Sequence, residues 1–375
     1  MKIAFVLNSS DPFGGASKSF LLLLEGVVKA GHKAMVVLPD EGMLKNKIES
    51  LGVKVHILNY RPNLYPYESN IIDYILWLPR LLARRMLNNK AVKKLSGLLD
   101  GVDIVHTNVS VIDIGCRAAN ICGIPHVYHF REYGMPDFGF RYYPSRNRFY
   151  KTIDYAICIT KDIQRYHSLD KRCNSIVVYN GIHNRVNVLP QRDDIDDYLL
   201  FAGRLEKTKG IEQVLEAYSI SGSSIPLKVA GGALKSSYLN KIKKMAEKLE
   251  ISDRVLFLGP VADIDNLMRN ANAVIVASEF EAFGRVMPEA MFQGCLVIGR
   301  DVGGTHEQFE NGLLYTGHEI GLRYSTTHEL AECIRCLPNV DDNMRQRAFD
   351  TVNCYYSLES NVASIIKFYN KILNK

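Results

Sequence analysis

Two successive runs of alternating strand and helix patterns constrain the fold more than any other feature of this sequence. Short apolar runs typical of buried parallel strands alternate with helical segments, and the alternation begins again after residue 197. Because a parallel sheet covered on both faces produces this pattern, each run predicts one doubly wound α/β domain. The expected strands are 3–8, 33–38, 54–58, 104–107, 126–130, 155–159 and 175–178, then 198–202, 227–230, 255–258, 273–277, 296–299 and 313–315. The expected helices include 17–30, 112–122, 210–218, 235–249, 287–293, 327–336 and 357–375.

A polar stretch between the two runs marks the expected domain boundary. Residues 183–197 carry Pro190 and four aspartates but little apolar content, which is typical of a linker. The predicted organisation is a first domain over 1–185, a linker over 186–197, a second domain over 198–355 and an amphipathic C-terminal helix over 356–375.

Composition indicates an ordinary globular protein. The 375 residues suit two domains, and 47% hydrophobic and 23% charged residues are usual values. No apolar run approaches the roughly 20 residues that span a bilayer, and residues 1–7 read as a strand rather than a signal peptide. Of eight scattered cysteines only Cys333 and Cys336 are close, in an expected helix, which favours core packing over a metal site. We therefore expect a cytoplasmic protein with reduced thiols.

Two carboxylates follow the strand expected at 273–277. Glu281 should lie in the strand-to-helix loop and Glu289 about one turn into the next helix, which has Pro288 in its first turn. Ligands bind beyond the carboxyl ends of strands in open α/β sheets, so both acids are site candidates. Taken singly, each glutamate is more simply explained as a helix cap or a solvated side chain.

A basic turn opens the second run. Arg204 leaves the carboxyl end of the first strand there, and Lys209 stands at the start of the following helix. An arginine fork and a lysine point charge beside free helix amides suit a diphosphate. A solvated basic turn is the alternative.

Three further segments are weak candidates by themselves. Gly14 and Gly15 precede the first helix and permit close approach of a ligand, but they complete neither the dinucleotide nor the Walker phosphate motif. His129 ends an apolar strand, where a histidine is more often structural than catalytic. The glycine turn at 299–307 also follows a strand. The acidic pairs at 194–196 and 263–265 suggest a linker and a helix cap, so no metal site is expected.

Taken in chain order, these motifs resemble those of the retaining glycosyltransferases of family 4. That family has the GT-B fold, in which two doubly wound parallel-sheet, Rossmann-like domains face each other across a cleft. The resemblance covers nearly the whole chain and is strongest around the two glutamates. The matching motifs are Gly14-Gly15-Ala16, Asn180-Gly181-Ile182, Gly203-Arg204-Leu205, Lys209-Gly210, Gly259-Pro260-Val261, the segment 278–291, and Gly303-Gly304 with Glu307.

The resemblance implies which domain binds each substrate and which residues bind the nucleotide. The first domain would be the acceptor side, the second would bind a nucleotide-sugar, and the final helix would pack back on the first domain. Arg204 and Lys209 would hold the donor diphosphate and stabilise the leaving nucleotide, as a metal does elsewhere. Val261 would lie along the base, while Gly14 and Gly15 would close over the phosphates. No metal and no cofactor is expected, since the nucleotide-sugar is itself a substrate.

The resemblance also implies roles at the sugar. Glu289 would bind the ribose hydroxyls, and Glu281 with the backbone around Phe283 and Gly284 would hold the transferred sugar. His129 would lie beside that sugar. These roles agree with the chemistry, because a departing nucleotide gains negative charge while the sugar ring gains oxocarbenium character.

Two positions depart from the family pattern. His183 stands where aspartate commonly follows Asn-Gly-Ile, which questions the hinge geometry. Arg285 occupies a place often held by an aliphatic residue and is a further donor-binding candidate at the sugar or phosphate.

The sequence indicates less about how the acceptor binds than about how the donor binds. The segment 71–94 is apolar with a basic flank, which fits either an anionic membrane surface or a buried helix with a solvated basic edge. The basic and aromatic loop 138–151 could contact an acceptor carrying phosphate or carboxylate. No nucleic-acid module is recognisable, so nucleic acid is not an expected partner.

The sequence therefore predicts a retaining, metal-independent, hexosyl-type glycosyltransferase that uses a nucleotide-sugar, with a UDP-sugar favoured. The expected acceptor is a glycan or a lipid-linked molecule in cell-surface polysaccharide synthesis, and the expected location is the cytoplasm or the inner face of the cell membrane. A non-catalytic GT-B subunit that binds a nucleotide or a partner transferase is the alternative. An NAD-dependent dehydrogenase is disfavoured because the glycine fingerprint is missing.

Overall fold

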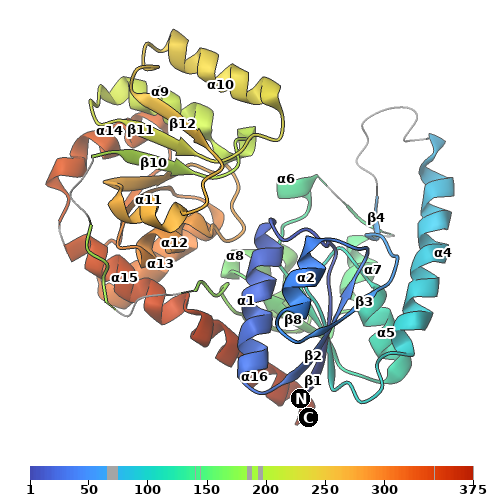
Figure 1. Cartoon of the computed structure of the whole chain (residues 1–375). Coiled ribbons are helices and arrows are strands. Elements are labelled where there is room, and N and C mark those ends of the chain that lie inside the picture. Colours follow the sequence, from blue (N-terminus) through green and yellow to red (C-terminus); the bar gives the residue numbers. More distant parts are fainter. Residues whose placement is uncertain are drawn as a thin grey trace. The chain divides into compact units, whose positions relative to one another are not determined.

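The chain forms two compact units. The computed structural model describes residues 1–65, 75–139, 141–143, 145–183, 188–192, 197–341 and 343–374. Unit 1 contains Met1–Gly181 and Leu358–Lys375, and unit 2 contains Ile182–Ser357 (Figure 1). Parts of the expected linker, and the beginning of the segment 71–94, lie outside the described residues.

Unit 1 is built on a seven-stranded parallel sheet with the order β3-β2-β1-β5-β6-β8-β9. The order changes direction between β1 and β5, so the loops after these two strands flank a topological switch point. The strands are β1 Lys2–Val6, β2 Lys33–Leu38, β3 Lys54–Ile57, β5 Ile104–Thr107, β6 His126–Phe130, β8 Tyr155–Cys158 and β9 Asn174–Val177. A separate antiparallel pair consists of β4 Leu64–Tyr65 and β7 Arg141–Tyr142.

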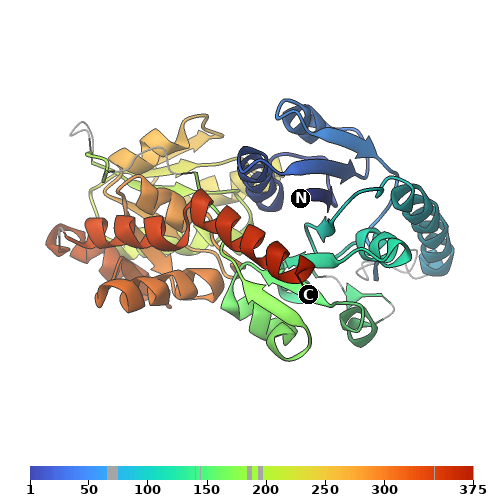
Figure 2. The same cartoon turned by 90° about the horizontal axis from the view of Figure 1, so that it is seen from below.

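Helices cover both faces of this sheet because its strands are apolar on both sides. Along β1, Ile3 and Phe5 join the core that α1, α2 and α16 cover, whereas Ala4 and Val6 join the core beneath α4 and α5. The C-terminal helix α16 packs against α1, as Figures 1 and 2 show. The helices are α1 Gly15–Lys29, α2 Met43–Glu49, α4 Trp77–Ser96, α5 Ile114–Cys122, α6 Met135–Phe138, α7 Arg146–Tyr150, α8 Lys161–His167 and α16 Leu358–Leu373.

Unit 2 is built on a six-stranded parallel sheet with the order β12-β11-β10-β13-β14-β15. Its switch point lies between β10 and β13. The strands are β10 Leu199–Ala202, β11 Leu227–Ala230, β12 Val255–Gly259, β13 Ala273–Val276, β14 Leu296–Arg300 and β15 Leu322–Tyr324. The helices are α9 Ile211–Ser221, α10 Ser236–Lys248, α11 Ile264–Asn270, α12 Val286–Phe292, α13 Gly303–Thr316, α14 Thr327–Cys336 and α15 Asn343–Tyr355.

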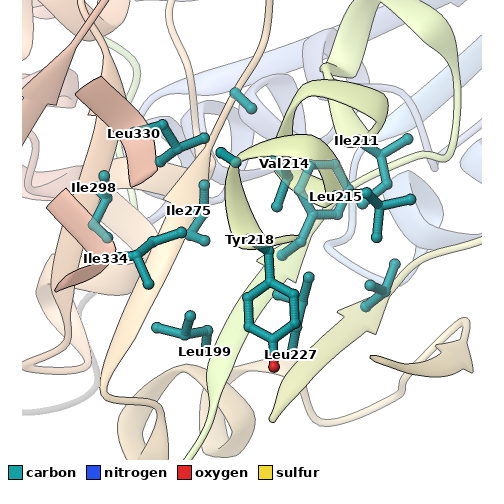
Figure 3. Packing of buried hydrophobic residues seen from close by; sticks show 14 of the residues in the cluster. Leu199, Ile211, Val214, Leu215, Tyr218, Leu227, Ile275, Ile298, Leu330 and Ile334 are labelled. Atoms are coloured by element: carbon teal, nitrogen blue, oxygen red, sulfur yellow. The ribbon is translucent and has the colours of Figure 1, made fainter. Parts of the chain in front are cut away.

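The core of unit 2 shows why these segments pack as they do. Leu199 and Ile275 project from neighbouring central strands toward Val214 of α9 and Leu330 of α14, all with at most 1% of their surface exposed (Figure 3). Alternate residues of each strand therefore face one layer of helices. The prediction of two parallel-sheet α/β units is confirmed, and within the described residues no helix is long and apolar enough to cross a bilayer.

Three sequence expectations need correction. The strand expected at 313–315 is the end of α13, where Leu314 is 75% exposed, and the edge strand is β15 instead. An apolar run on the outer surface of a helix has the same local composition as a short strand. The expected loop 138–151 contains β7 and α7, which the stacked rings of Tyr142 and Phe149 hold together. Cys336 is exposed rather than packed in the core.

Candidate active site

The switch point of unit 2 brings the basic turn and the acidic loop together. The basic turn follows β10, the loop with Glu281 follows β13, and these two strands are hydrogen-bonded neighbours. The Glu279 backbone N–H donates to the Thr208 carbonyl over 2.9 Å and ties the two loops to each other. Two motifs about seventy residues apart in sequence therefore form one cluster.

Lys209 is the residue of the basic turn that reaches the acidic loop. Its Nζ lies 3.0 Å from Glu281 Oε2, and both side chains are mostly buried. Lys209 ends a 3-10 helix, Lys207–Lys209, rather than starting α9 as the sequence suggested. Arg204 leaves β10 as predicted but remains 61% exposed, with its guanidinium 3.0 Å from Glu206. Both cations thus lie at the carboxyl edge of the sheet.

Gly210 makes the close approach of these loops sterically feasible. It has a φ of +74°, and a Cβ placed there would lie 2.0 Å from the Ala277 carbonyl oxygen at the end of β13. Only glycine accepts both the left-handed backbone and this contact. Gly231, after the neighbouring strand β11, has a similar role, since a Cβ there would lie 1.7 Å from the Gly203 carbonyl oxygen.

Glu289 has its own cationic partner. It lies in the first turn of α12, as predicted, and its Oε1 accepts from Arg285 Nε at 3.0 Å and lies 2.9 Å from Arg285 Nη2. The arginine that departs from the family pattern therefore anchors the carboxylate expected at the ribose. The two glutamates belong to two separate ion pairs rather than to one acidic pair.

The loop between these ion pairs is fixed through its backbone. The Phe283 side chain is buried against Tyr356, so only its backbone remains to meet a ligand. The side-chain amide of Gln308 donates to the carbonyl oxygens of Phe283 and, at 3.3 Å, Gly284. The sequence did not indicate Gln308, because nothing in its local pattern distinguishes it from a solvated helix residue. Val261 follows β12 at the sheet edge, two strands away from Arg204's strand.

The remaining candidates lie in unit 1 around its own switch point. Gly14 is the extended residue that precedes α1, and Gly15 is the first residue of the helix. His129 lies on β6, next to β5, and is 1% exposed. Neither glycine has a left-handed φ, so the backbone conformation does not require glycine at these positions. What the two glycines allow is the close approach of a ligand to the backbone.

The hydrogen bonds of His129 determine which of its nitrogens carries the proton. Arg131 Nη2, which can only donate, lies 3.2 Å from His129 Nδ1, so this nitrogen accepts. His106 Nε2 then donates to the same atom over 3.2 Å, and His106 Nδ1 accepts from the Tyr369 hydroxyl at 2.5 Å. His129 Nε2 therefore bears the hydrogen, and this buried atom has no hydrogen-bond partner among the described residues.

Burial makes His129 a neutral hydrogen-bond donor. Desolvation lowers its pKa well below the usual value, and the charge of Arg131 adds to the effect. A neutral ring with its proton on Nε2 can donate to a ligand oxygen but cannot act as a base at that atom. The sequence identified the residue but not its tautomer, which depends on Arg131 and on α16.

A buried polar network beside His129 escaped the sequence analysis. Arg131 donates to Asn108 and, at 2.5 Å, to the Asn180 side chain, while Glu132 accepts from the Ser110 backbone at 2.9 Å. Buried charges with full hydrogen bonding hold loops rigidly. The sequence signals were the position of Arg131 and Glu132 directly after the His129 strand and the Asn180-Gly181-Ile182 motif, and neither indicated that these residues meet. Within the described chain no group of three or more His, Cys, Asp or Glu side chains could hold a metal ion.

Acidification should destabilise unit 1 through its buried histidines. Burial lowers the pKa of His126 to about 3 and that of His167 to about 4, and it also lowers those of His106 and His129. Below about pH 6.5 the unfolded chain binds more protons than the folded chain, so stability falls, by up to about 1.4 kcal/mol per pH unit for each histidine. Urea unfolding between pH 7.5 and 5.5 measures this slope.

A pair of variants checks that the slope comes from burial. His126→Gln should make the dependence shallower by about one proton, whereas His318→Gln, at an exposed position of unit 2, should leave it unchanged. An identical slope in the wild type and in His126→Gln would contradict the assignment.

Comparisons with known proteins match both units. Residues 13–185 match the family model described as Glycosyltransferase Family 4, and residues 190–332 match the one described as Glycosyl transferases group 1. An uncharacterized glycosyltransferase of Methanocaldococcus jannaschii is 26% identical over 343 residues, 82% of either chain. The N-acetyl-alpha-D-glucosaminyl L-malate synthase of Bacillus anthracis is 29% identical over 230 residues, 56% of this chain and 58% of the synthase.

Solved structures share the fold. Anabaena HepE in complex with UDP superposes with a TM-score of 0.80 at 20% identity and covers 99% of this chain and 100% of its own. Further structures of the same protein contain UDP and glucose, or UDP-glucose. Two family models that cover most of the sequence, together with the doubly wound fold of both units, lead to the conclusion that this chain belongs to glycosyltransferase family 4 and has the GT-B fold.

Proposed function

We propose that this glycosyltransferase moves a hexosyl group from a UDP-sugar to a glycan or lipid-linked acceptor, with retention of anomeric configuration and without a metal ion. The cluster of Arg204, Lys209, Glu281 and Glu289 at the unit 2 switch point carries the proposal. Complexes of the structurally similar Anabaena HepE with UDP and UDP-glucose support the choice of nucleotide.

The proposed roles follow from charge and position. Arg204 and Lys209 bind the diphosphate, and Lys209 also orients Glu281 toward the sugar hydroxyls. Glu289, held by Arg285, binds the ribose. Val261 lies along the base, and the backbone of Phe283 and Gly284 contacts the sugar. In unit 1, Gly14 and Gly15 close over the phosphates and His129 donates from Nε2 to a sugar oxygen.

The proposed chemical step needs no protein base. The bond between the anomeric carbon and the diphosphate oxygen breaks, and its electron pair stays on the diphosphate. The acceptor hydroxyl oxygen bonds to the same face of the anomeric carbon, and its proton passes to the departing phosphate oxygen. Glu281 and Glu289 each form an ion pair with a basic side chain at about 3 Å, which supports a binding role rather than a role as a base for both.

A transfer assay tests the proposal. The protein is incubated with a panel of UDP-sugars in excess EDTA, and sugar release and the anomeric configuration of the product are followed by NMR. We expect donor hydrolysis or transfer by at least one UDP-sugar, undiminished by EDTA, with the product in the donor's configuration. UDP binding without turnover of any donor would instead identify a non-catalytic subunit, and rescue by manganese after EDTA would overturn the metal-free step.

Helix α4 supports a role at the inner face of the cell membrane. Leu78, Leu82 and Met86 recur every fourth residue and are each more than half exposed, forming what we call the apolar stripe of α4. The same helix carries basic residues and no acidic one. An exposed apolar stripe with a cationic flank is suited to an anionic lipid surface.

Liposome sedimentation tests the membrane role. Leu82→Glu combined with Met86→Glu should weaken binding to anionic vesicles by at least about tenfold, because it removes apolar contacts and adds negative charge. Leu314→Glu, at an exposed leucine of unit 2, is the control and should bind as the wild type does. Equal binding by all three proteins would exclude α4 as the contact.

A further inference from the structure

The lining of a cavity of about 450 Å³ in unit 1 contains none of the residues proposed to bind the donor. It lies between α4, α5 and the β4–β7 pair, on the side of the sheet where the carboxyl end of β5 lies. Its size is within the range of small-molecule sites. The lining residues are Asn63, Leu81, Arg85, Asn88, Asn89, Asp113, Arg117, Tyr143 and Arg148.

Hydrogen bonds between the lining residues make the cavity a preformed site. Asn63 Nδ2 donates to Asp113 Oδ2 at 3.2 Å, and the Tyr143 backbone N–H donates to the Asn63 carbonyl at 3.2 Å. Arg117, one helical turn after Asp113, donates from Nη2 to Asn89 Oδ1 at 2.5 Å, which connects α5 to α4. Four separate segments are therefore held in place before any ligand arrives.

The lining has an excess of positive charge. Its three arginines face a single carboxylate, Asp113, which lies 3.8 Å from Arg117. Arg85 and Arg148 are exposed, and within the described part of the chain no carboxylate lies within 4.0 Å of either guanidinium. Guanidinium groups without a carboxylate partner bind phosphate oxygens in a bidentate manner.

One buried acceptor atom in the lining favours a ligand with a hydroxyl group. Asp113 Oδ1 is buried and has no hydrogen-bond partner among the described residues. Burial raises the pKa of this carboxyl, and Arg117 partly offsets the effect. A buried acceptor is stabilised when a ligand hydroxyl donates to it. A ligand that carries both a phosphate and a nearby hydroxyl therefore satisfies the lining best.

The position of the cavity on α4 relates it to the lipid surface. Leu81, Arg85 and Asn88 line the cavity from one face of the helix, and Leu82 and Met86 of the apolar stripe each directly follow a lining residue. Successive helix residues are separated by about 100°, so the two faces are adjacent. If the stripe lies on a bilayer, the cavity opens at the level of the lipid headgroups.

We propose that this cavity binds the phosphate of a lipid-linked glycosyl acceptor, with Arg85, Arg117 and Arg148 on the phosphate and Asp113 on a sugar hydroxyl. The inference rests on the proposed transferase function, for which it specifies the class of acceptor. Arg85 and Arg148 are the residues to change, because Arg117 also holds Asn89 and Asp113 in place.

Vesicle binding tests the proposal. Phosphatidylcholine vesicles carrying a sugar linked to a polyprenyl diphosphate are compared with vesicles of the same charge carrying phosphatidic acid, whose headgroup has no sugar or glycerol hydroxyl, with UDP saturating the donor site. Wild-type protein should prefer the diphosphate vesicles by at least about tenfold, and Arg85→Gln combined with Arg148→Gln should abolish the preference. The matched control, Lys47→Gln with Lys171→Gln, removes two exposed charges from the same unit and should retain it.

Each outcome decides one point. No preference in the wild type, or equal loss in the control, would overturn the proposal. Glucose 1-phosphate, titrated in parallel, should bind more weakly than the vesicles; equal binding that depends on Arg85 and Arg148 would overturn the lipid source in favour of a soluble sugar phosphate. UDP binding and donor hydrolysis are measured in every variant. If UDP binding and donor hydrolysis are absent, the proposed transferase function is refuted. If both are present but the protein does not prefer the diphosphate vesicles, the cavity assignment is refuted.

Discussion

Lys209→Ala is expected to lower kcat/KM by about 10²–10³, which corresponds to about 2.7–4 kcal/mol of transition-state stabilisation. The reason is that Lys209 is mostly buried at the switch point, where its charge would face the diphosphate as the nucleotide leaves. Steady-state kinetics with the best UDP-sugar donor measure the loss. The larger share should appear in kcat, since the negative charge develops during the reaction.

The neighbouring lysine provides the control for this prediction. Lys207 lies on the same 3-10 turn but is exposed, and Lys207→Ala should change kcat/KM by less than about threefold. Glu281→Gln should also reduce activity, and its effect should not add to that of Lys209→Ala, because the two side chains are 3.0 Å apart. Full additivity, or a Lys209→Ala enzyme with normal rates, would refute the proposed pairing.

Gly210→Ala is expected to destabilise unit 2 by about 2–5 kcal/mol, from left-handed strain and from overpacking. The new Cβ would lie 2.0 Å from the Ala277 carbonyl oxygen, so the basic turn must move away from the end of β13. That movement separates Lys209 from Glu281, and activity should fall together with stability. Urea unfolding and kinetics at a temperature where the variant is folded measure the two effects.

Gly222 separates the two causes. It has a φ of +64° at the end of α9, but a Cβ there meets nothing within 4 Å. Gly222→Ala should therefore cost only about 1–2 kcal/mol and leave the rate unchanged. If both variants lost the same stability and activity, contact between the two loops would not be the reason for glycine at position 210.

Much of the fold could be predicted because it is coded locally. The apolar runs at Lys33–Leu38 and Ala273–Val276 are strands in the structure, and the amphipathic pattern at Thr327–Cys336 is a helix. The failure at 313–315 has a physical reason, since three apolar residues on the outside of α13 carry no periodicity that distinguishes helix from strand. Short elements are where local patterns carry the least information.

The candidate site was predictable in its residue types but not in its contacts. Each motif could be assigned to the carboxyl end of a strand, because a strand pattern followed by a loop is visible in sequence. That Lys209 pairs with Glu281 and Arg285 with Glu289 depends on β10 lying beside β13 and on the turn of α12. Strand order is a long-range property that no local window contains.

By itself the sequence determined two α/β units, the residues at the ends of their strands and a resemblance to one family. Only the tertiary structure decided the two ion pairs, the proton on His129 Nε2 and the cavity lined by Arg85, Arg117 and Arg148. The difference is physical. Periodicity reports how one segment meets a core, whereas charge pairing, tautomer and cavity shape arise from segments that meet only after the chain has folded.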